Sequence, residues 1–189
     1  MILTILILIV LLWTFYTGWR RGMVGQLVYF IGYAITFFIA TQKYEIVGQK
    51  LELWIPYPEA ALNQTMTFYS SDMLLKLSHS FYAAMGFMLI MFIGWVLTHF
   101  IGIFFRSHRR NFIGRINRLC GGVLNMIFGY IGLFLILYVL TFIPINAIQL
   151  QLAQSPLAQW MIRNTPLLSE WIYQWWIVNI SQPVLQKGM

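Results

Sequence analysis

The sequence predicts an all-α integral membrane protein with four transmembrane helices. Hydrophobic residues make up 60% of the 189 residues, charged residues make up 9%, and the mean hydropathy is +0.73. A water-soluble domain of this length needs a more polar surface. The chain also contains four long runs without Asp, Glu, Lys or Arg, and each approaches or exceeds the length of about 20 residues that crosses the hydrocarbon layer.

The four runs place a transmembrane domain over residues 1–143. Each run is expected to be helical, because backbone polar groups in lipid need partners within the chain. The first run lacks the basic start and small-residue cleavage site of a secretory signal, so we expect it to be retained. Pro144 is a natural end for the fourth run. The predicted spans are residues 1–18, 22–42, 78–105 and 119–143.

Arginine placement predicts which side of the membrane each connection faces. The two short connections hold seven arginines and no acidic residue, whereas the other segments hold five basic and five acidic residues. Short loops rich in Lys and Arg stay cytoplasmic, so both termini and the loop over residues 43–77 are expected outside the cytoplasm. Because the basic residues adjoin membrane spans, we expect them to meet anionic headgroups and not nucleic acid. These arginines are Arg20, Arg21, Arg106, Arg109, Arg110, Arg115 and Arg118.

An internal repeat connects the second and fourth spans. RGMVGQLVYFIGY begins at Arg21, RLCGGVLNMIFGY begins at Arg118, and both fit R-x3-G-x6-G-Y. The pattern predicts two hairpins that are parallel repeats about an axis along the membrane normal. Coincidence is the alternative, since Gly and Tyr are common in membrane helices.

Small residues in the spans are expected to mediate helix packing, because helices in lipid associate through close backbone approach. We expect the glycine faces of the third and fourth spans to contact each other or a second copy. The glycines assigned to packing are Gly22, Gly25, Gly32, Gly86, Gly94, Gly102, Gly122 and Gly129.

Little in the sequence points to chemistry. No Asp, Glu, Lys or Arg lies within the predicted spans, no HExxH, GxSxG or Walker motif is present, and there is a single cysteine. We therefore expect no enzymatic activity, catalytic residue, metal site or cofactor. Polar residues in the spans either bridge helices or line a pore formed by several copies. Those that we single out are Gln26, Tyr33, His99, Asn125 and Tyr130.

The tail over residues 144–189 predicts two short interfacial helices outside the cytoplasm. Ser155-Pro156 and Thr165-Pro166 each combine a favoured N-cap with proline at the first helical position. A fifth span within this tail is the alternative, which Glu170 and its polar neighbours disfavour. In the outer loop, residues 59–77 are expected to form a helix that leads into the third span. The tryptophans assigned to the headgroup layer are Trp160, Trp171, Trp175 and Trp176.

The two junctions resemble a known family. GWRRGMVGQLVYFIGYA and RINRLCGGVLNMIFGYIGLFLILYVL are similar to the CvpA (colicin V production protein) family, and the tail looks like its Gram-positive branch. The resemblance covers most of the membrane part. It implies a bacterial inner-membrane protein linked to bacteriocin production and envelope homeostasis. Many members carry an acidic residue early in the first span, where this chain has Thr4, so no role of that carboxylate is carried over.

Two functions fit these observations. The first is a non-enzymatic scaffold or accessory factor in the membrane, with anionic lipid, a second copy of the chain and unidentified envelope proteins as expected partners. The alternative is a small oligomeric channel or transporter, with a polar stripe on the second and fourth spans.

Overall fold

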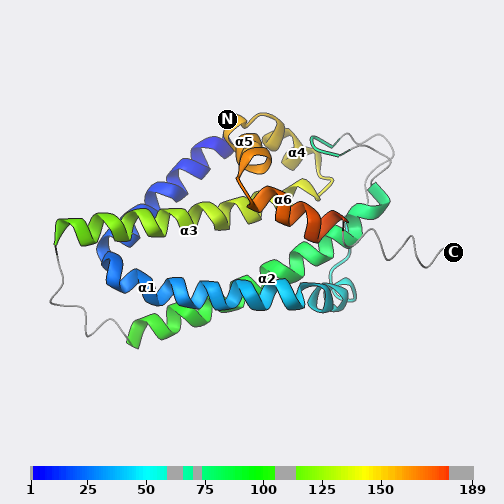
Figure 1. The fold of residues 1–189 in the computed structure, drawn as a ribbon. Coiled ribbons are helices and arrows are strands. Elements are labelled where there is room, and N and C mark those ends of the chain that lie inside the picture. The colour runs from blue at the N-terminus through cyan, green and yellow to red at the C-terminus, as the bar shows by residue number, and fades with distance from the viewer. Residues whose placement is uncertain (1, 59–65, 70–73, 105–113, 179–189) are drawn as a thin grey trace. The chain divides into compact units, whose positions relative to one another are not determined.

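The computed structural model of the chain describes residues 2–58, 66–69, 74–104 and 114–178. Within these ranges the regular structure is helical and contains no strand, so the predicted all-α class is confirmed. The elements are α1 (Ile2–Glu52), α2 (Leu74–Phe104), α3 (Arg115–Thr141), α4 (Asn146–Ala153), α5 (Pro156–Asn164), α6 (Leu168–Tyr173) and the π-helix η3 (Gln174–Val178) (Figure 1).

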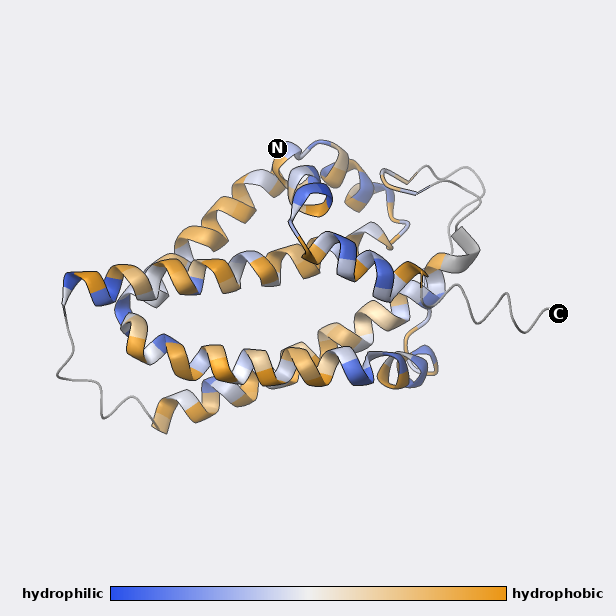
Figure 2. Cartoon of the chain, in the orientation of Figure 1, coloured by the Kyte–Doolittle hydropathy of each residue, from blue (hydrophilic) through white to orange (hydrophobic). Residues whose placement is uncertain are grey.

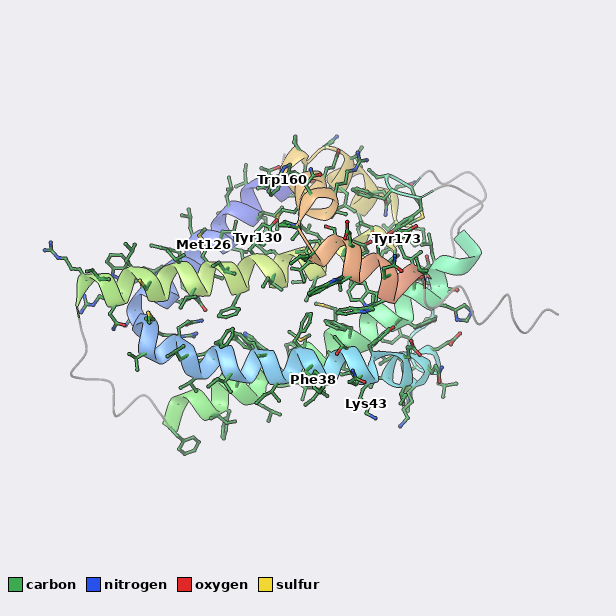
Figure 3. The ribbon with its side chains drawn as sticks, in the orientation of Figure 1. Phe38, Lys43, Met126, Tyr130, Trp160 and Tyr173 are labelled. Atoms are coloured by element: carbon green, nitrogen blue, oxygen red, sulfur yellow. The ribbon has the colours of Figure 1, made fainter. Side chains whose placement is uncertain are left out.

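Three of the described helices are long and apolar enough to cross a membrane, namely α1, α2 from Leu77, and α3. Hydrophobic residues predominate along these three helices (Figure 2). Phe38, on the second half of α1, is 67% exposed (Figure 3). Such side chains suit contact with lipid, which is as apolar as they are. The structure thus has three helices of spanning length where the sequence predicts four spans, because α1 contains the first two runs.

Helix α1 is broken at Gly22. This residue has φ 72° and ψ 167°, a conformation that is essentially restricted to glycine because a β-carbon would clash with the backbone. A straight helix of 51 residues would extend about 75 Å at 1.5 Å per residue. That length is more than twice the hydrocarbon thickness of about 30 Å. At Gly22 the helix changes direction (Figure 1), directly after the two arginines.

The chain separates into two compact units. One consists of Ile5–Gln42 and Met88–Leu133, and is called the long-helix unit below. The other consists of Met1–Thr4, Lys43–Phe87 and Phe134–Met189, and is called the tail unit. The helices of the first unit therefore continue into the second, and α1 extends beyond the predicted end of the second span at Gln42 to Glu52.

The tail unit has its own core. Its fully buried side chains come from α2, α3 and the tail helices, and Gln149 of α4 connects several of these segments. The Gln149 Nε2 donates to the Ile143 carbonyl at 2.9 Å, and its Oε1 accepts from the Thr67 backbone N–H at 3.1 Å. Helix α4, which the sequence analysis did not anticipate, is held in place by these bonds. The largest fully buried side chains include Phe87, Phe134, Phe142, Leu152, Met161, Ile172 and Trp176.

One of the two predicted helix caps in the tail is correct. Ser155 is the N-cap of α5, and its Oγ accepts from the Ala158 N–H at 3.2 Å. Its hydroxyl also lies 2.8 Å from that of Thr4. The second cap was wrong: α6 begins only at Leu168, and the Thr165 hydroxyl donates instead to the Met161 carbonyl at 2.5 Å. The free carbonyls at the end of α5 compete successfully for this hydroxyl.

Two other expectations for the outer segments are affected. Residues 66–69 are not helical, and α2 begins at Leu74, so the predicted helix over 59–77 is wrong for 66–69, while 59–65 and 70–73 lie outside the described residues. The region of the alternative fifth span holds the short α6 and η3, and neither is of membrane-spanning length. The rest of that region, from residue 179, lies outside the described part.

Candidate functional site at the break in α1

The first half of α1 packs closely against α3 through glycine. A β-carbon placed on Gly121 would lie 2.5 Å from the carbonyl carbon of Gly22 and 2.8 Å from the oxygen of Gly18. A β-carbon on Gly129 would lie 2.6 Å from the Thr14 methyl group. Real β-carbons do not approach heavy atoms this closely, so the two backbones touch where side chains would otherwise separate them. Gly122 packs in the same way against Phe15.

The second half of α1 packs against α2 in the same manner. A β-carbon on Gly94 would overlap the Thr36 side chain, and one on Gly32 would overlap that of Thr98. Gly102 leaves room for the ring and hydroxyl of Tyr29. Both threonines are buried.

Within the tail unit the α1–α2 contact is again close at a pair of glycines. A β-carbon on Gly86 would lie 2.6 Å from the backbone nitrogen of Gly48. Among the other glycines assigned to packing, Gly22 lies against Asn117, and Gly25 is buried on the second half of α1.

These contacts correct the predicted partners. We expected the glycine faces of the third and fourth spans to meet each other or a second copy, but both faces pack on α1. Helical spacing defines which face of a helix is smooth enough for close approach. It does not define which neighbour the fold brings to that face.

Asn125 forms the polar centre of the α1–α3 contact. Its Nδ2 donates to the Thr14 carbonyl at 2.6 Å and to the Thr17 hydroxyl at 2.9 Å. Its Oδ1 accepts from the Nε2 of Gln26 at 2.8 Å. One side chain on α3 therefore connects both halves of α1, on either side of the break.

The Gln26 side chain is fully buried, and its Oε1 has no hydrogen-bond partner among the described residues. An unpaired buried carbonyl oxygen costs about 1–3 kcal/mol. The Asn125 amide hydrogens are both already engaged, so exchanging the O and N of Gln26 would not satisfy this oxygen. Gln26 is therefore the least satisfied member of the cluster.

Asn117 caps the second half of α1. Its Oδ1 accepts from the backbone N–H of Met23 at 3.0 Å, directly after the break. A helix start leaves its first backbone N–H groups without partners, and a side chain on α3 supplies one here. Asn117 belongs to the family motif RINRLCGG, and the sequence alone does not predict its capping role. The sequence feature that could have indicated this role is its position directly before Arg118, where one copy of the internal repeat begins. Gly22 lies in the other copy, which begins at Arg21.

Arg21 is half-buried and contacts two side chains of the long-helix unit, whereas Arg20 is exposed. The guanidinium carbon of Arg21 lies 4.2 Å from the centre of the Tyr29 ring, and one of its nitrogens lies 3.3 Å from Nε2 of His99. Since an arginine only donates hydrogen bonds, this His99 nitrogen is the acceptor. Nδ1 of His99 then carries the proton and donates to the Trp95 carbonyl at 3.0 Å.

The other arginines predicted to meet lipid headgroups differ in what the structure describes of them. Arg115 and Arg118 are exposed on the first turns of α3, whereas Arg106, Arg109 and Arg110 lie outside the described residues. Of the aromatic residues predicted for the polar stripe, Tyr33 packs edge-on against Phe128 with ring centres 5.4 Å apart. Tyr130 is half-buried on α3 (Figure 3).

The interfacial assignment of Trp176 was wrong. This side chain is fully buried in the tail unit, where its ring packs against those of Phe87, Tyr138 and Phe142 at centroid distances of 5.5, 5.7 and 6.3 Å. A buried ring does not reach lipid headgroups. Trp160 on α5 and Trp171 on α6 are 52% and 47% exposed, and Trp175 is half-buried (Figure 3).

No set of three or more His, Cys, Asp or Glu side chains in the described ranges is arranged to hold a metal ion. Cys120 is a free, half-buried thiol on α3. The main feature of the site is the close packing of the two halves of α1, the first against α3 and the second against α2.

Long apolar helices joined through glycine contacts define a multi-pass α-helical membrane protein. The chain belongs to the Colicin V production protein family, whose model matches residues 3–166. This confirms the resemblance of the two junctions, and the match ends before α6. A similar protein is the uncharacterized transmembrane protein YshB of Bacillus subtilis (strain 168), which is 31% identical over 176 residues, covering 92% of this chain and 97% of that protein. No solved structure matches the chain.

Proposed function

We propose that this protein is a non-enzymatic scaffold or accessory factor in the bacterial cytoplasmic membrane. Its family name associates it with colicin V production, and we extend this to a role in bacteriocin export and envelope homeostasis. The observation that carries the proposal is the use of the intramembrane polar groups. Asn125 and Gln26 bond to each other, and Asn125 also bonds to Thr14 and Thr17 of α1. Polar groups engaged in this way hold helices together.

The proposal includes four membrane crossings, two of them made by the halves of α1. The break at Gly22 supports this, because it follows two arginines and allows the helix to reverse. By the positive-inside rule, Arg20 and Arg115 then lie at the cytoplasmic face, where they meet anionic headgroups, and both termini lie outside.

The repeat of two hairpins is supported by matching contacts. If the first span corresponds to the third and the second to the fourth, then a contact between spans two and three has a counterpart between spans four and one. Gly32 packs on Thr98, and Gly129 packs on Thr14. Four residues after Thr14 lies Gly18, and four residues after Thr98 lies Gly102. Each of these two glycines also makes a close helix contact.

A small channel or transporter formed by several copies is the second candidate. The Gln26 Oε1, which no described residue bonds, favours it, because a pore would supply water to that oxygen. The polar stripe would then comprise Gln26, Tyr33, Asn125 and Tyr130.

Reconstitution into liposomes separates the two functions. The scaffold predicts no ion or solute flux above that of empty liposomes at any applied voltage. Flux that vanishes with Asn125→Leu and also with Gln26→Met, while the variants still fold, would establish the channel and refute the scaffold. Crosslinking through Cys120 in native membranes then identifies a second copy or the envelope partners of the scaffold.

A further inference from the structure

The last turns of α1 carry a surface that the glycine contacts leave uncovered. Residues 43–54 belong to the tail unit and follow directly on the apolar run that ends at Gln42. They comprise the end of α1 and one further turn, in which the Trp54 N–H donates to the Leu51 carbonyl at 2.9 Å. We call this segment the outer turns of α1. If the second half of α1 crosses the membrane as proposed above, the outer turns begin in the outer headgroup layer, because about 20 residues span the hydrocarbon.

One face of the outer turns is fixed against α2. Tyr44 and Gly48 are buried on this face, and a β-carbon on Gly48 would lie 2.6 Å from the Tyr82 carbonyl oxygen. The Tyr82 hydroxyl donates to the Ile55 carbonyl at 2.7 Å, directly after the segment. These contacts prevent the segment from rotating about its axis, so the fold determines which side chains its other faces present.

The exposed side chains of the outer turns separate into two stripes. Residues three, four and seven apart share one face of a helix, and every member of both stripes is exposed. Lys43, in the first stripe, points away from the helices (Figure 3). The first stripe, called the Lys–Trp stripe, comprises Lys43, Ile46, Lys50, Leu53 and Trp54. The second, called the acidic stripe, comprises Glu45, Gln49 and Glu52.

The apolar members of the Lys–Trp stripe are unusually exposed. Leu53 and Trp54 are each 84% exposed, more than any other large apolar side chain in the described ranges, and Ile46 is 52% exposed. Removal of such side chains from water is favourable. Tryptophan is enriched at the level of the lipid headgroups. Lysine suits the same layer, because its alkyl stem lies along apolar surface while the ammonium group remains among polar groups.

The charges of the outer turns are arranged for an external partner and not for each other. Neither Lys43 nor Lys50 has Asp or Glu three or four residues away, the spacing at which helical side chains pair. The nearest acidic residues, Glu45 and Glu52, each follow a lysine by two residues, and side chains at that spacing do not face each other. The positive charges therefore share a face with apolar side chains, and the carboxylates lie on another face. A surface that is both apolar and anionic is complementary to the Lys–Trp stripe.

We propose that the Lys–Trp stripe binds the outer surface of the membrane and prefers anionic lipid. Leu53 and Trp54 lie among the headgroups, Lys43 and Lys50 meet lipid phosphates, and the acidic stripe faces water. Apolar and basic side chains on one face are the features that hold a helix in the plane of the interface. The contact fixes the tail unit to the membrane surface through α1. The proposal rests on the crossing of the second half of α1, which belongs to the proposed function.

Fluorescence quenching in lipid nanodiscs tests the contact. In a full-length Cys120→Ser background, a bimane probe is attached to Ile46→Cys, Leu53→Cys, Glu45→Cys or Glu52→Cys, all at exposed positions. The quencher is a nitroxide on the lipid acyl chain just below the headgroups. Neighbours such as 45 and 46 differ by only about 1.5 Å along the helix axis, so they differ in depth only if one face of the helix meets the lipid.

Quenching at Ile46→Cys and Leu53→Cys should be at least about threefold stronger than at Glu45→Cys and Glu52→Cys, because an interfacial helix buries its apolar face about 5–10 Å into the headgroup layer. Equal quenching within each pair of neighbours, with less at 53 than at 46, would show that the outer turns extend into water. No quenching at any of the four positions would show that the stripe meets a partner other than lipid. Either result overturns the proposal.

A second measurement tests the preference for anionic lipid. In nanodiscs of phosphatidylcholine and phosphatidylglycerol, the nitroxide is carried by one lipid or by the other. Quenching at Leu53→Cys should be at least about twofold stronger from phosphatidylglycerol, because each lysine near the surface attracts anionic headgroups. Lys43→Gln with Lys50→Gln should abolish this difference. The matched pair, Glu45→Gln with Glu52→Gln, should not lower it.

An equal response to the two nitroxide lipids in the wild type, or a difference that survives loss of both lysines, refutes the preference for anionic lipid. The side of the membrane from which Leu53→Cys is labelled tests the crossing itself, since the headgroup layer is open to water on that side. Failure of the crossing and failure of the surface contact therefore give different results, and the liposome result on the scaffold is independent of both.

Discussion

Replacement of Asn125 by alanine probes the contact between α3 and the two halves of α1. The substitution removes two donors, to the Thr14 carbonyl and the Thr17 hydroxyl, and the acceptor for Gln26. It also removes the partner of the Gln26 Nε2, in an amide whose Oε1 already has no hydrogen-bond partner among the described residues.

The size of the effect follows from these contacts. Hydrogen bonds between membrane helices average about 0.6 kcal/mol and reach about 1.7 kcal/mol. Three such bonds amount to about 2 kcal/mol, and the newly orphaned Gln26 nitrogen adds to this. We expect Asn125→Ala to lower the free energy of unfolding by about 2–4 kcal/mol. Unfolding in mixed micelles with increasing SDS measures this free energy.

Gln26→Met is the matched comparison. It removes one of the three bonds and leaves the Asn125 Oδ1 without that donor, but it also removes the Gln26 Oε1, which has no partner among the described residues and whose burial costs about 1–3 kcal/mol. The two unsatisfied oxygens offset each other, so the variant should be destabilised only by the lost bond, by about 0.6–1.7 kcal/mol. If Asn125→Ala unfolds like the wild type, or if Gln26→Met is as destabilising as Asn125→Ala, the cluster is not what holds α3 to α1.

Three other predictions follow from the packing and the burial of single residues. Gly22→Ala should lower the free energy of unfolding by about 1–3 kcal/mol, because alanine does not tolerate φ 72° and ψ 167°; an unchanged SDS midpoint would show that the break is absent. Gly86→Leu should prevent folding in detergent, because Gly48 lies against that position, whereas Gly132→Leu should be tolerated, since beyond its own stretch of helix no described residue has a heavy atom within 4 Å of an added β-carbon; size-exclusion chromatography tests both. Burial raises the pKa of Tyr57 to about 12 from 10, and a raised folded-state pKa gives stability that is complete below about pH 10 and is lost as the pH rises toward 12. The tyrosinate absorbance at 295 nm is titrated for the wild type and for Tyr57→Phe, and the difference between the two curves reports Tyr57. This difference should therefore appear only near pH 12, and its appearance at pH 10 would contradict the burial of Tyr57.

The sequence was sufficient for the fold class and for the place where α1 breaks. Uncharged runs on both sides of Arg20 and Arg21 required a change of direction there, and Gly22 supplies the conformation. The Ser155 cap of α5 was predictable because capping depends on neighbouring residues alone. The Thr165 cap failed because another local acceptor, the Met161 carbonyl, binds the same hydroxyl.

The individual polar residues of the candidate site could be predicted from the sequence, but the contacts between them could not. Asn125 and Gln26 were singled out separately, and nothing in the sequence shows that they bond to each other across the break. Trp176 was misplaced because a tryptophan at an interface and one in an aromatic core look alike in sequence. The distinction depends on Phe87 and Tyr138, which are distant in the chain.

Labelling of single cysteines in intact cells tests the central claim, that both halves of α1 cross the membrane. In a Cys120→Ser background, cysteine is placed at the exposed positions Ile2, Leu53 and Ile116, which lie at the start of the first half of α1, just after its second half and at the start of α3. An impermeant maleimide should label Ile2→Cys and Leu53→Cys from outside, and Ile116→Cys only after the membrane is opened. If Ile2→Cys and Leu53→Cys are labelled from opposite sides, α1 crosses once and the account is wrong.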